Sequence, residues 1–546
     1  MKMFPNQLSR WKNLNGSNTI IEVMSQRSYC ALIIIWCLSI VIYYSSIRII
    51  LFDGAPQKIR HDSGFQKTFM RGDIVDRNGR LLCKTIQCYS CFVNPRNIIT
   101  KDVLQLSKKI SQIIGKDHKE IYKKISNKNT SFVWVKRHID NDVRSKLMAL
   151  GDPGIQIVED YSRKAIHKKI TKHIIGVCDV DGNGLSYLEK YFDASLKKGE
   201  PIILSIDLYL QSTIHNILYE DMKIYNADGA NAILMDINSG EILAMVSMPD
   251  VDLNRNTSGA FEPGSTFKIL NTAVALDSGL VKLRETFATN SIVKIAQYQI
   301  RDWTYKDYPL NVGEILIYSS NKGSVLMQRK FGSDIQKKYL ESFGLLEKCH
   351  VELNEVSKPI LPRFTSTDGE SISYGYAISV SPLAQLSAIA SVLNGGHLVK
   401  PTLVKMYNYD KRQAKRVVSE ETSKTLAEIM RLVMVYGTGR TANVSDIGLC
   451  GKTGTAQKVI KGGYGKNQNI TTFVGVFPYF RPRFVILVMY DNPKSNSNLT
   501  TAAHNASKTA KKILQTIAPT MMCGETIQES SNEIRMLSQK YMQNLM

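Results

Sequence analysis

Apolar residues are concentrated in a few patterned segments of the chain, and each segment predicts one element. The segment Tyr29–Ile47 contains no charged residue and is rich in Ile, Leu and Val. As an α-helix it would be about 28 Å long, close to the hydrocarbon thickness of a bilayer. A cleaved signal peptide has a shorter apolar core, and Ser45-Ser46 is a poor cleavage site. We therefore predict an uncleaved transmembrane anchor over residues 29–52, with a buried core helix as the less favoured alternative.

Helical spacing of apolar residues marks further segments. Val103–Ile114 predicts a helix between short strands. Phe267, Leu270 and Val274 recur at i, i+3 and i+7, and Gly279 is placed to end that helix. A closing helix is expected over Ala502–Ile517. Beyond it, a weak amphipathic helix and a frayed tail are equally compatible with the spacing of Ile534, Leu537, Tyr541 and Leu545.

Short apolar runs bounded by turn residues predict strands. Ala232–Ile237 and Ile242–Met248 are joined through Asn238-Ser239-Gly240, a composition typical of a hairpin turn. Late in the chain, strands are expected over Cys450–Lys458, Thr472–Val476 and Phe484–Tyr490, with a glycine-rich loop at residues 462–465 between the first two. A sheet begun by early strands, completed by late ones and covered by helices is an α+β fold.

Composition limits the classes of function. The 546 residues suffice for two or three domains, and the formal net charge is +22. The lysines are scattered, without the arginine-rich tract or aromatic-basic repeat of a nucleic-acid module, so we expect no nucleic-acid partner. A basic surface also suits anionic lipid headgroups or an acidic polymer, and a generally lysine-rich composition explains it equally well.

The cysteines predict free thiols. Of the 9 cysteines, Cys30 and Cys37 fall in the predicted anchor, and the remainder cannot all pair, which excludes a dense disulfide framework. Cys88 and Cys91 have the spacing of a redox or zinc pair, but no second ligand pair has zinc spacing. The alternating Tyr89 and Phe92 favour a strand with buried thiols instead.

The segment Ser265-Thr266-Phe267-Lys268 carries the strongest chemical signal. A serine hydroxyl needs a nearby base to act as a nucleophile at neutral pH. Residues three apart share one helical face, so Lys268 can reach Ser265. Taken alone, a Ser/Lys pair at this spacing usually just solvates a helix surface. Two later motifs change that interpretation: Ser319-Ser320-Asn321 gives S-x-N, and Lys452-Thr453-Gly454-Thr455 gives K-T-G-T. The three motifs in this order are those of serine acyl-transfer enzymes of the penicillin-binding and β-lactamase group.

The chain resembles the class B penicillin-binding proteins over about residues 71–495, including the first motif of their pedestal domain at Arg71–Gly79. The division-specific (FtsI-type) transpeptidases are the more similar subfamily, because Gly437-Thr438-Gly439 precedes the K-T-G-T motif. Further matching segments are Leu204–Asp207 with Leu210-Gln211, Gly240–Met245 and Tyr374-Gly375-Tyr376. One family feature is missing: the aromatic-proline pair expected after an arginine is replaced by Ala165-Ile166 following Arg163-Lys164.

The resemblance implies an architecture. We expect an α+β protein with a single transmembrane helix, an elongated α/β pedestal and a serine β-lactamase-like transpeptidase domain, whose central antiparallel sheet is flanked by helices. The expected parts are a cytoplasmic tail (1–28), the anchor (29–52), the pedestal (53–225, beginning with a charged stalk over 53–70), the transpeptidase domain (226–518) and a C-terminal tail (519–546).

The resemblance also implies roles for the motif residues. Ser265 would attack the carbonyl between two D-alanines of a stem peptide, and an amine of a neighbouring stem would resolve the ester. Lys268 must be neutral to accept a proton, and we expect the nearby Lys452 to lower its pKa because like charges disfavour protonation. Ser319 would relay the proton to the leaving amine, and Asn321 would hold Lys268 and the substrate amide.

The K-T-G-T segment is expected to bind the substrate as an edge strand. Lys452, Thr453 and Thr455 would hold the terminal carboxylate, and Gly454 would let the substrate approach closely. In the family, the backbone N–H groups of Ser265 and Thr455 form the oxyanion hole. Loss of one such donor costs about 10²–10³ in rate in a serine hydrolase.

Nucleotide and metal chemistry are disfavoured, and we expect no cofactor. Gly451-Lys452-Thr453 resembles the end of a P-loop, but that motif needs glycine where this chain has Asp446. Lys452 is also predicted on a strand, whereas the P-loop lysine opens a helix. The 9 histidines include no H-E-x-x-H or comparable ligand cluster.

Three functions remain open. The first is a septal D,D-transpeptidase of the inner membrane, working beside a polytopic glycosyltransferase and other division proteins and inhibited by β-lactams; an elongation-specific relative is its runner-up. The second is a β-lactam hydrolase or sensor, which would need neither anchor nor pedestal. The third is a division scaffold with a vestigial site, which the intact motifs disfavour. Charges flanking the anchor do not decide its orientation, and the resemblance places the catalytic domain in the periplasm.

Overall fold

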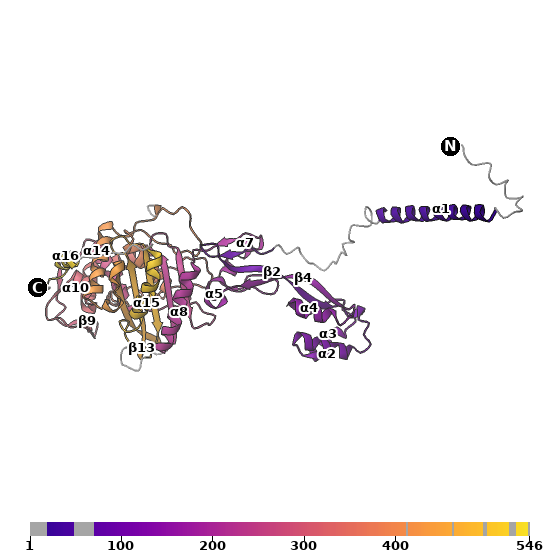
Figure 1. Ribbon diagram of the computed structural model, residues 1–546. Helices are drawn as coiled ribbons and strands as arrows, with labels where there is room; N and C mark the ends of the chain where they lie inside the picture. Colours follow the sequence, from indigo (N-terminus) through magenta and orange to yellow (C-terminus); the bar gives the residue numbers. More distant parts are fainter. Residues whose placement is uncertain are drawn as a thin grey trace. The chain divides into compact units, whose positions relative to one another are not determined.

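The computed structural model describes residues 19–48, 70–410, 413–460, 463–494, 500–522 and 531–543. Contacts divide the chain into a unit ending at Thr68 and a second unit beginning at Phe69. Several predicted parts lie outside the described residues: residues 1–18 of the N-terminal tail, 49–52 of the anchor, 53–69 of the stalk, and 523–530 and 544–546 of the C-terminal tail, including Leu545. Figure 1 shows the ribbon, coloured along the sequence, with some of its helices and strands labelled.

The described residues of the first unit form the helix α1 (Thr19–Arg48), which begins inside the segment that we predicted to be a tail. Its large apolar side chains from Leu32 to Tyr44 are exposed. Among the described residues, no helix satisfies the length and hydropathy required of a membrane span. The transmembrane anchor over residues 29–52 therefore stays a prediction.

The second unit begins with a five-stranded sheet built around the long strand β2 (Leu81–Val93). β2 pairs antiparallel with β4 (Ile155–Ala165) and with β3 (Val133–Ile139), and the short β1 (Ile74–Val75) links it to β5 (Ile202–Ile203). Cys88 and Cys91 lie on β2 and are both free thiols, as are the other cysteines whose state the structure describes, Cys37, Cys83, Cys178, Cys349 and Cys450.

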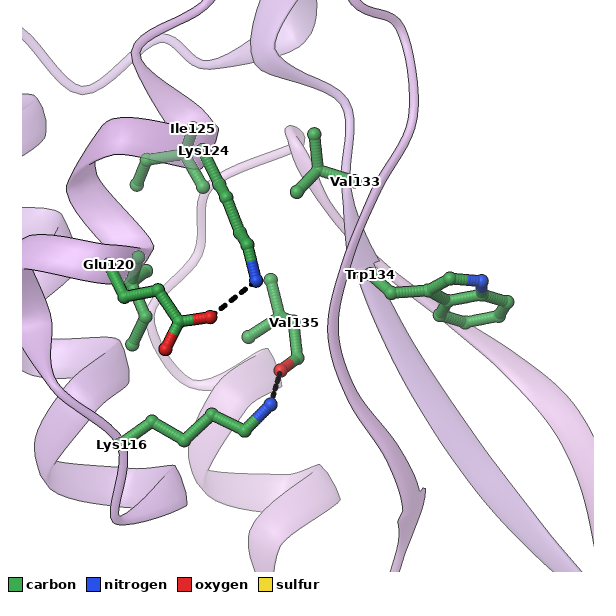
Figure 2. Close-up of a pocket in the computed structure, with 8 residues that line it drawn as sticks. Lys116, Glu120, Lys124, Ile125, Val133, Trp134 and Val135 are labelled. Carbon is green, nitrogen blue, oxygen red and sulfur yellow. Dashed lines mark hydrogen bonds and ion pairs between the residues drawn. The ribbon is translucent and has the colours of Figure 1, made fainter. Parts of the chain in front are cut away.

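Three helices pack on one end of this sheet and bury their own small core. α2 (Val103–Ile114) has the predicted bounds; it is followed by α3 (His118–Ile125) and α4 (Asn141–Met148). Figure 2 shows a small pocket here, where Lys116 Nζ donates to the Val135 carbonyl at 3.1 Å and Lys124 pairs with Glu120 at 2.5 Å. The two lysines and the glutamate that line the pocket all have partners, so the pocket offers no reactive group. The remaining elements of this part are η3 (Pro95–Asn97), α5 (Lys168–Ile175), α6 (Tyr187–Tyr191) and α7 (Asp193–Lys197).

The family motif at residues 71–79 connects the first sheet to the rest of the unit. The guanidinium of Arg71 is buried and pairs with Glu189 at 2.6 Å and with Asp193 at 2.7 Å. Arg163 on β4 pairs with the same Glu189 at 2.7 Å. Arg163 is the arginine after which the family has its aromatic-proline pair. In this chain the arginine is held by the buried Glu189 carboxylate although the pair itself is absent. The Arg77 amide donates to the Ile206 carbonyl at 2.9 Å, so the motif also contacts the chain entering the second domain.

The second domain is built on a fully antiparallel sheet in the order β12-β13-β14-β6-β7. Its early strands are β6 (Gly229–Asp236) and β7 (Ile242–Met248), and its late strands are β12 (Cys450–Ile460), β13 (Gly463–Phe477) and β14 (Phe484–Asp491). The predicted pairing of early with late strands is confirmed by β6 beside β14. In the described part of the chain β12 has one strand partner, β13, so the K-T-G-T segment lies at the sheet edge, as expected.

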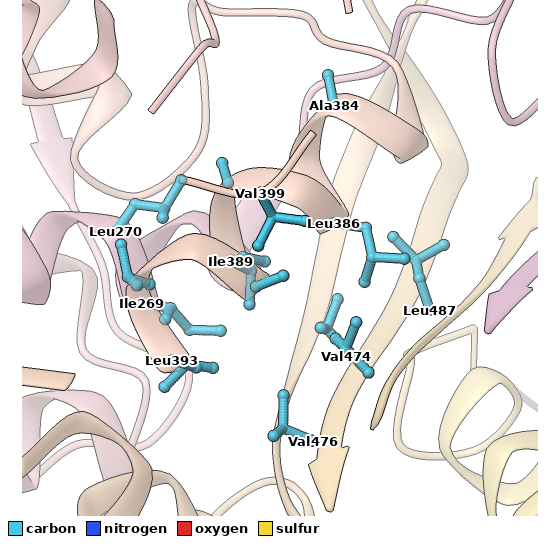
Figure 3. Packing of buried hydrophobic residues seen from close by; sticks show 14 of the residues in the cluster. Ile269, Leu270, Ala384, Leu386, Ile389, Leu393, Val399, Val474, Val476 and Leu487 are labelled. Atoms are coloured by element: carbon cyan, nitrogen blue, oxygen red, sulfur yellow. The ribbon is translucent and has the colours of Figure 1, made fainter. Parts of the chain in front are cut away.

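Helices cover both faces of this sheet. α13 (Pro382–Leu393) packs on one face, and α9 (Lys268–Asp277) packs against α13. Ile269, Ile389 and Leu393 of these helices belong to the same buried core as Val474 and Val476 of the sheet (Figure 3). α8 (Leu208–Ile224) and α15 (Ala506–Met521) pack on the other. The remaining elements are β8 (Thr286–Phe287), β9 (Val293–Ile295), β10 (Tyr298–Ile300), β11 (Leu310–Asn311), α10 (Val312–Ile317), α11 (Asn321–Ser342), α12 (Ser366–Ile372), α14 (Glu420–Val435), η6 (Arg440–Ala442), η7 (Ser445–Ile447) and α16 (Ser531–Tyr541).

Some element bounds differ from those predicted. Gly463, Tyr464 and Gly465 were placed in a loop, but they belong to β13, because Val459 pairs with Tyr464 and prolongs the hairpin. α15 starts four residues later than predicted, at Ala506, where the Asn505 side chain caps its first turn. α8 packs its buried Leu210, Ile214 and Leu218 with the second sheet, although we predicted residues up to 225 to belong to the pedestal.

Candidate active site

Ser265 lies in a tight 3₁₀ turn, η4 (Gly264–Phe267), that runs directly into α9. Gly264 has a φ of 55°, and a side chain there would meet Thr455 and Ala456 of β12 at 3.1–3.2 Å. A residue with a side chain would be strained in this conformation and would crowd the edge strand. The nucleophile turn is thus pressed against the edge strand that carries the K-T-G-T motif.

Lys268 occupies the first turn of α9 and points at the serine. Its Nζ lies 3.1 Å from Ser265 Oγ, 2.6 Å from Asn321 Oδ1 and 2.7 Å from the Ser319 carbonyl oxygen. The side chain is 1% exposed, and this burial lowers the pKa of Lys268 to about 7 despite the opposing charge of Asp302. The structure therefore brings together the first two predicted motifs around one amine that can be neutral near pH 7.

The hydroxyl of Ser319 lies between two amines. Lys452 Nζ donates to Ser319 Oγ at 2.8 Å, and Lys268 Nζ lies 3.3 Å from the same oxygen. Ser319 lies in the short connection between α10 and α11 and is held at a φ of 60°, which is uncommon for a residue with a side chain. Such strained conformations concentrate at functional sites.

The electrostatics differ from our expectation in one respect. We predicted that Lys452 would lower the pKa of Lys268, but burial is the dominant cause for Lys268. Burial also lowers the pKa of Lys452, and here the neighbouring charge of Lys268 adds to the effect. The two amines are both sealed from water, so each resists protonation chiefly through loss of hydration.

The K-T-G-T segment is held from three sides. Thr453 Oγ1 and Thr438 Oγ1 are 2.7 Å apart, which places the Gly437-Thr438-Gly439 motif at the site. The Ala502 amide donates to Thr455 Oγ1 at 3.1 Å. At Gly454, a Cβ would lie 2.9 Å from Thr266 Cγ2 and 3.1 Å from the Pro263 carbonyl oxygen. The absence of a side chain at Gly454 therefore lets the nucleophile turn pack against β12, a reason that the sequence did not suggest.

Asp302 is a site residue that the sequence analysis missed. Its carboxylate accepts hydrogen bonds from the Asn321 amide and Ser320 Oγ, each at 2.6 Å, and from the Lys322 amide at 3.1 Å. The neighbouring Arg301 carbonyl accepts from Asn321 Nδ2 at 2.9 Å. Asp302 thus fixes the N-terminal turn of α11 and the S-x-N motif with it. No local pattern around residue 302 indicates this, because the contact forms only in the folded chain.

Comparisons with known proteins agree with the geometry. Residues 230–515 match the model of the penicillin binding protein transpeptidase domain, and residues 67–201 match that of the penicillin-binding protein dimerisation domain. A "Probable peptidoglycan D,D-transpeptidase FtsI" of Caulobacter vibrioides is 30% identical over 82% of this chain and 81% of its own length. "Stage V sporulation protein D" of Bacillus subtilis is 30% identical over 78% of this chain and 74% of its own length.

A more distant relative and a solved structure also match the chain. "Peptidoglycan D,D-transpeptidase FtsI" of Escherichia coli is 26% identical over 79% of this chain and 80% of its own. A crystal structure of a peptidoglycan synthetase from Bifidobacterium adolescentis superimposes with a TM-score of 0.68 at 20% identity, covering 85% of this chain and 97% of that one. At this identity, the solved structure shows a common fold.

Proposed function

The chain belongs to the class B penicillin-binding proteins, and from this premise we propose that it crosslinks peptidoglycan stem peptides at the division septum through an ester on Ser265. Its activity is that of a serine-type peptidoglycan D,D-transpeptidase. The observation that supports the assignment of the nucleophile is the placement of a buried Lys268 amine, with a pKa of about 7, at 3.1 Å from Ser265 Oγ.

The reaction has two half-steps that balance through the serine. Ser265 Oγ bonds to the carbonyl carbon between two D-alanines and gives its proton to neutral Lys268. The carbon–nitrogen bond then breaks, and the leaving D-alanine takes a proton through the Ser319 hydroxyl, which lies near both amines. An amine of a second stem attacks the ester and passes a proton through the Ser319 hydroxyl to Lys268, which returns it to Ser265 Oγ as the ester bond breaks. One amide is broken and one is made.

The substrate would lie along the free edge of β12. Lys452, Thr453 and Thr455 hold the terminal carboxylate, whose negative charge favours the ammonium form of Lys452. The backbone amides of Ser265 and Thr455 stabilise the oxyanion; the close approach of Gly264 to Thr455 supports this pairing. The substrate backbone adds to the sheet as a further strand beside Gly454. Asn321 holds Lys268 through its Oδ1 at 2.6 Å.

Fluorescent penicillin labelling of the full-length protein tests the assignment. We expect the label to attach to Ser265 and to remain for many minutes, and Ser265→Ala to abolish it while the unfolding midpoint changes little. Rapid release of hydrolysed drug would instead indicate a β-lactam hydrolase. Absence of any label on a folded wild-type protein would favour a scaffold with a vestigial site.

The septal role and its partners are the finer part of the proposal. The motif Gly437-Thr438-Gly439 lies at the site, and relatives from Caulobacter vibrioides and Escherichia coli carry the name FtsI. We infer a single-pass inner-membrane protein with a periplasmic catalytic domain, recruited beside a polytopic glycosyltransferase. The equally similar Bacillus subtilis relative is named for sporulation, and an elongation-specific enzyme is the competing assignment.

A further inference from the structure

A buried carboxyl group beside the nucleophile turn has no role in the chemistry above. The side chain of Glu262 is 9% exposed, and Glu262 lies three residues before Ser265 in the sequence. Its Oε1 accepts hydrogen bonds from the Ala377 amide at 2.9 Å and from the Tyr464 hydroxyl at 3.2 Å. Its Oε2 is buried and has no hydrogen-bond partner. No ion pair with Lys, Arg or His compensates this carboxyl within the described ranges, and burial raises its pKa. A buried carboxylate without a cation is an unusual feature.

Tyrosine rings surround the carboxyl group. Tyr374 and Tyr376 follow α12, and their ring centroids are 5.3 Å apart. Tyr464 comes from β13, and its ring centroid lies 5.7 Å from that of Tyr376 in an edge-on arrangement. A carboxylate beside several aromatic rings can bind an alkylammonium group, through charge and cation–π attraction together.

This tyrosine–carboxyl cluster lies at a defined point of the substrate path. The Gln457 amide of β12 donates to the Tyr376 hydroxyl at 3.4 Å, and the Gly264 amide donates to the Gly375 carbonyl at 3.0 Å. The proposed contacts of the terminal carboxylate are the side chains of Lys452, Thr453 and Thr455, and the scissile carbonyl lies at the backbone amide of Thr455. A donor peptide that continues past the scissile bond therefore reaches Gln457, and the cluster, with the residue that precedes its two D-alanines.

We propose that Glu262, Tyr374, Tyr376 and Tyr464 bind the alkylammonium side chain of the residue that precedes D-alanyl-D-alanine in the donor stem peptide. This inference rests on the proposed function. Crosslinking needs an amine on the acceptor, and donor and acceptor stems are alike, so the donor carries an amine of its own. The cluster holds that amine as a cation, which distinguishes the donor peptide and keeps its amine from attacking the ester.

Tyr464 lies on the solvent-exposed side of the tyrosine–carboxyl cluster. It is 48% exposed, and one 3.2 Å hydrogen bond joins its hydroxyl to Glu262. An entering ammonium takes the place of this hydroxyl, reaches Oε2 and leaves the Tyr464 ring against its methylene groups. Ala377 continues to donate to Oε1, so the carboxylate is held in place while the ligand binds.

The test compares three peptides on the full-length protein: Nα-acetyl-Lys-D-Ala-D-Ala, its Nε,Nε-dimethyl form, which keeps the charge, and its Nε-acetyl form, which removes it. Each preparation is first titrated with fluorescent penicillin, so that D-alanine release is expressed per mole of Ser265 that can be acylated. The variants are Glu262→Gln and, as a matched control, Glu421→Gln at the exposed start of α14.

In the wild type, we expect the two charged peptides to have a kcat/KM about tenfold to a hundredfold above that of the acetylated peptide, as for a hydrogen bond to a charged group. Glu262→Gln should reduce this ratio to about one by lowering the rates of the charged peptides, and Glu421→Gln should preserve it. Equal rates for all three peptides in a wild type that takes up penicillin, or an unchanged ratio in Glu262→Gln, would overturn the inference. Failure of the wild type to take up penicillin would instead overturn the proposed function on which it rests.

Discussion

At the scale of single residues, the site depends on two amines that are kept from water and share one hydroxyl. Each loses hydration on burial, which lowers the pKa of both Lys268 and Lys452. Asp302 is the nearby negative charge, and it opposes the effect at Lys268 while it fixes Asn321 and Ser320. The balance between burial and the Asp302 carboxylate sets the pKa of Lys268, and so the pH above which Lys268 is neutral and can act as the base.

The acylation rate is therefore expected to rise with pH through about 7 and to level off above it, because Lys268 must be neutral. In Asp302→Asn the carboxylate no longer favours the ammonium form, so the pKa of Lys268 falls further and the acid limb moves to lower pH. Stopped-flow acylation by a penicillin between pH 5 and pH 9 measures the limb. If the substitution merely loosened the positioning of Asn321, the maximal acylation rate at high pH would fall while the acid limb stayed at the same pH. The electrostatic and the positional effects of Asp302 can therefore be told apart. An acid limb that stays in place in the variant would show that Asp302 has no electrostatic part.

Lys452 is expected to act through its charge at the substrate carboxylate and through Ser319. Lys452→Ala removes the 2.8 Å hydrogen bond to Ser319 Oγ together with the cation, and should lower acylation by at least about 10²–10³. Lys452→Arg should retain part of the acylation rate, because the positive charge remains while a planar guanidinium replaces the compact ammonium group. Wild-type acylation by the folded alanine variant would contradict the assignment of the carboxylate site.

At the scale of elements, local periodicity predicted those helices and strands whose ends are set by neighbouring residues. α2 and β7 have the predicted bounds because an apolar period and a turn residue coincide at each end. The start of α15 was missed because Asn505, rather than an apolar residue, sets it. Asp302 and the tyrosine–carboxyl cluster could not be predicted, since their partners lie on other elements and only folding brings them together. The three motifs were predictable because fixed spacing and order carry their chemistry.

The C-terminal helix α16 is an element whose docking the sequence left open. Tyr541 is 1% exposed, and its hydroxyl donates to Glu428 of α14. Nearby, the Gln543 amide donates to Glu314 of α10 at 3.0 Å, close to the turn that holds Ser319. α16 therefore braces the helix that leads into the S-x-N motif.

Tyr541→Ala should lower the free energy of unfolding by about 3–5 kcal/mol, as expected when a large buried ring is removed. The midpoint of chemical denaturation of the full-length protein measures the loss. Met536→Ala on the same helix is the control, because Met536 is 62% exposed and should change the midpoint little. Equal midpoints for the two variants would mean that α16 is not held by its buried face in solution.

At the scale of the whole molecule, the buried ion pairs of Glu189 with Arg71 and Arg163 hold the first sheet to its flanking helices, and α8 marks where the second domain begins. The first match to a known domain ends at residue 201 and the second starts at residue 230. α8 lies between them and buries its apolar face on the second sheet. A fusion limited to the N-terminal part should therefore end before Leu208, because a longer piece would expose that face.

This boundary determines the test of the septal role. A fluorescent fusion of residues 1–207, which lacks Ser265 and the entire second sheet, is expected to gather at midcell if the N-terminal part contacts the division partners. A fusion of the full-length Ser265→Ala variant is the control, since it keeps every surface and loses only the nucleophile. Midcell signal from both fusions would mean that recruitment needs neither catalysis nor the second domain. A uniform signal along the cell body from the full-length variant would favour the elongation-specific role, because an inactive but complete protein retains every contact that a septal partner could use.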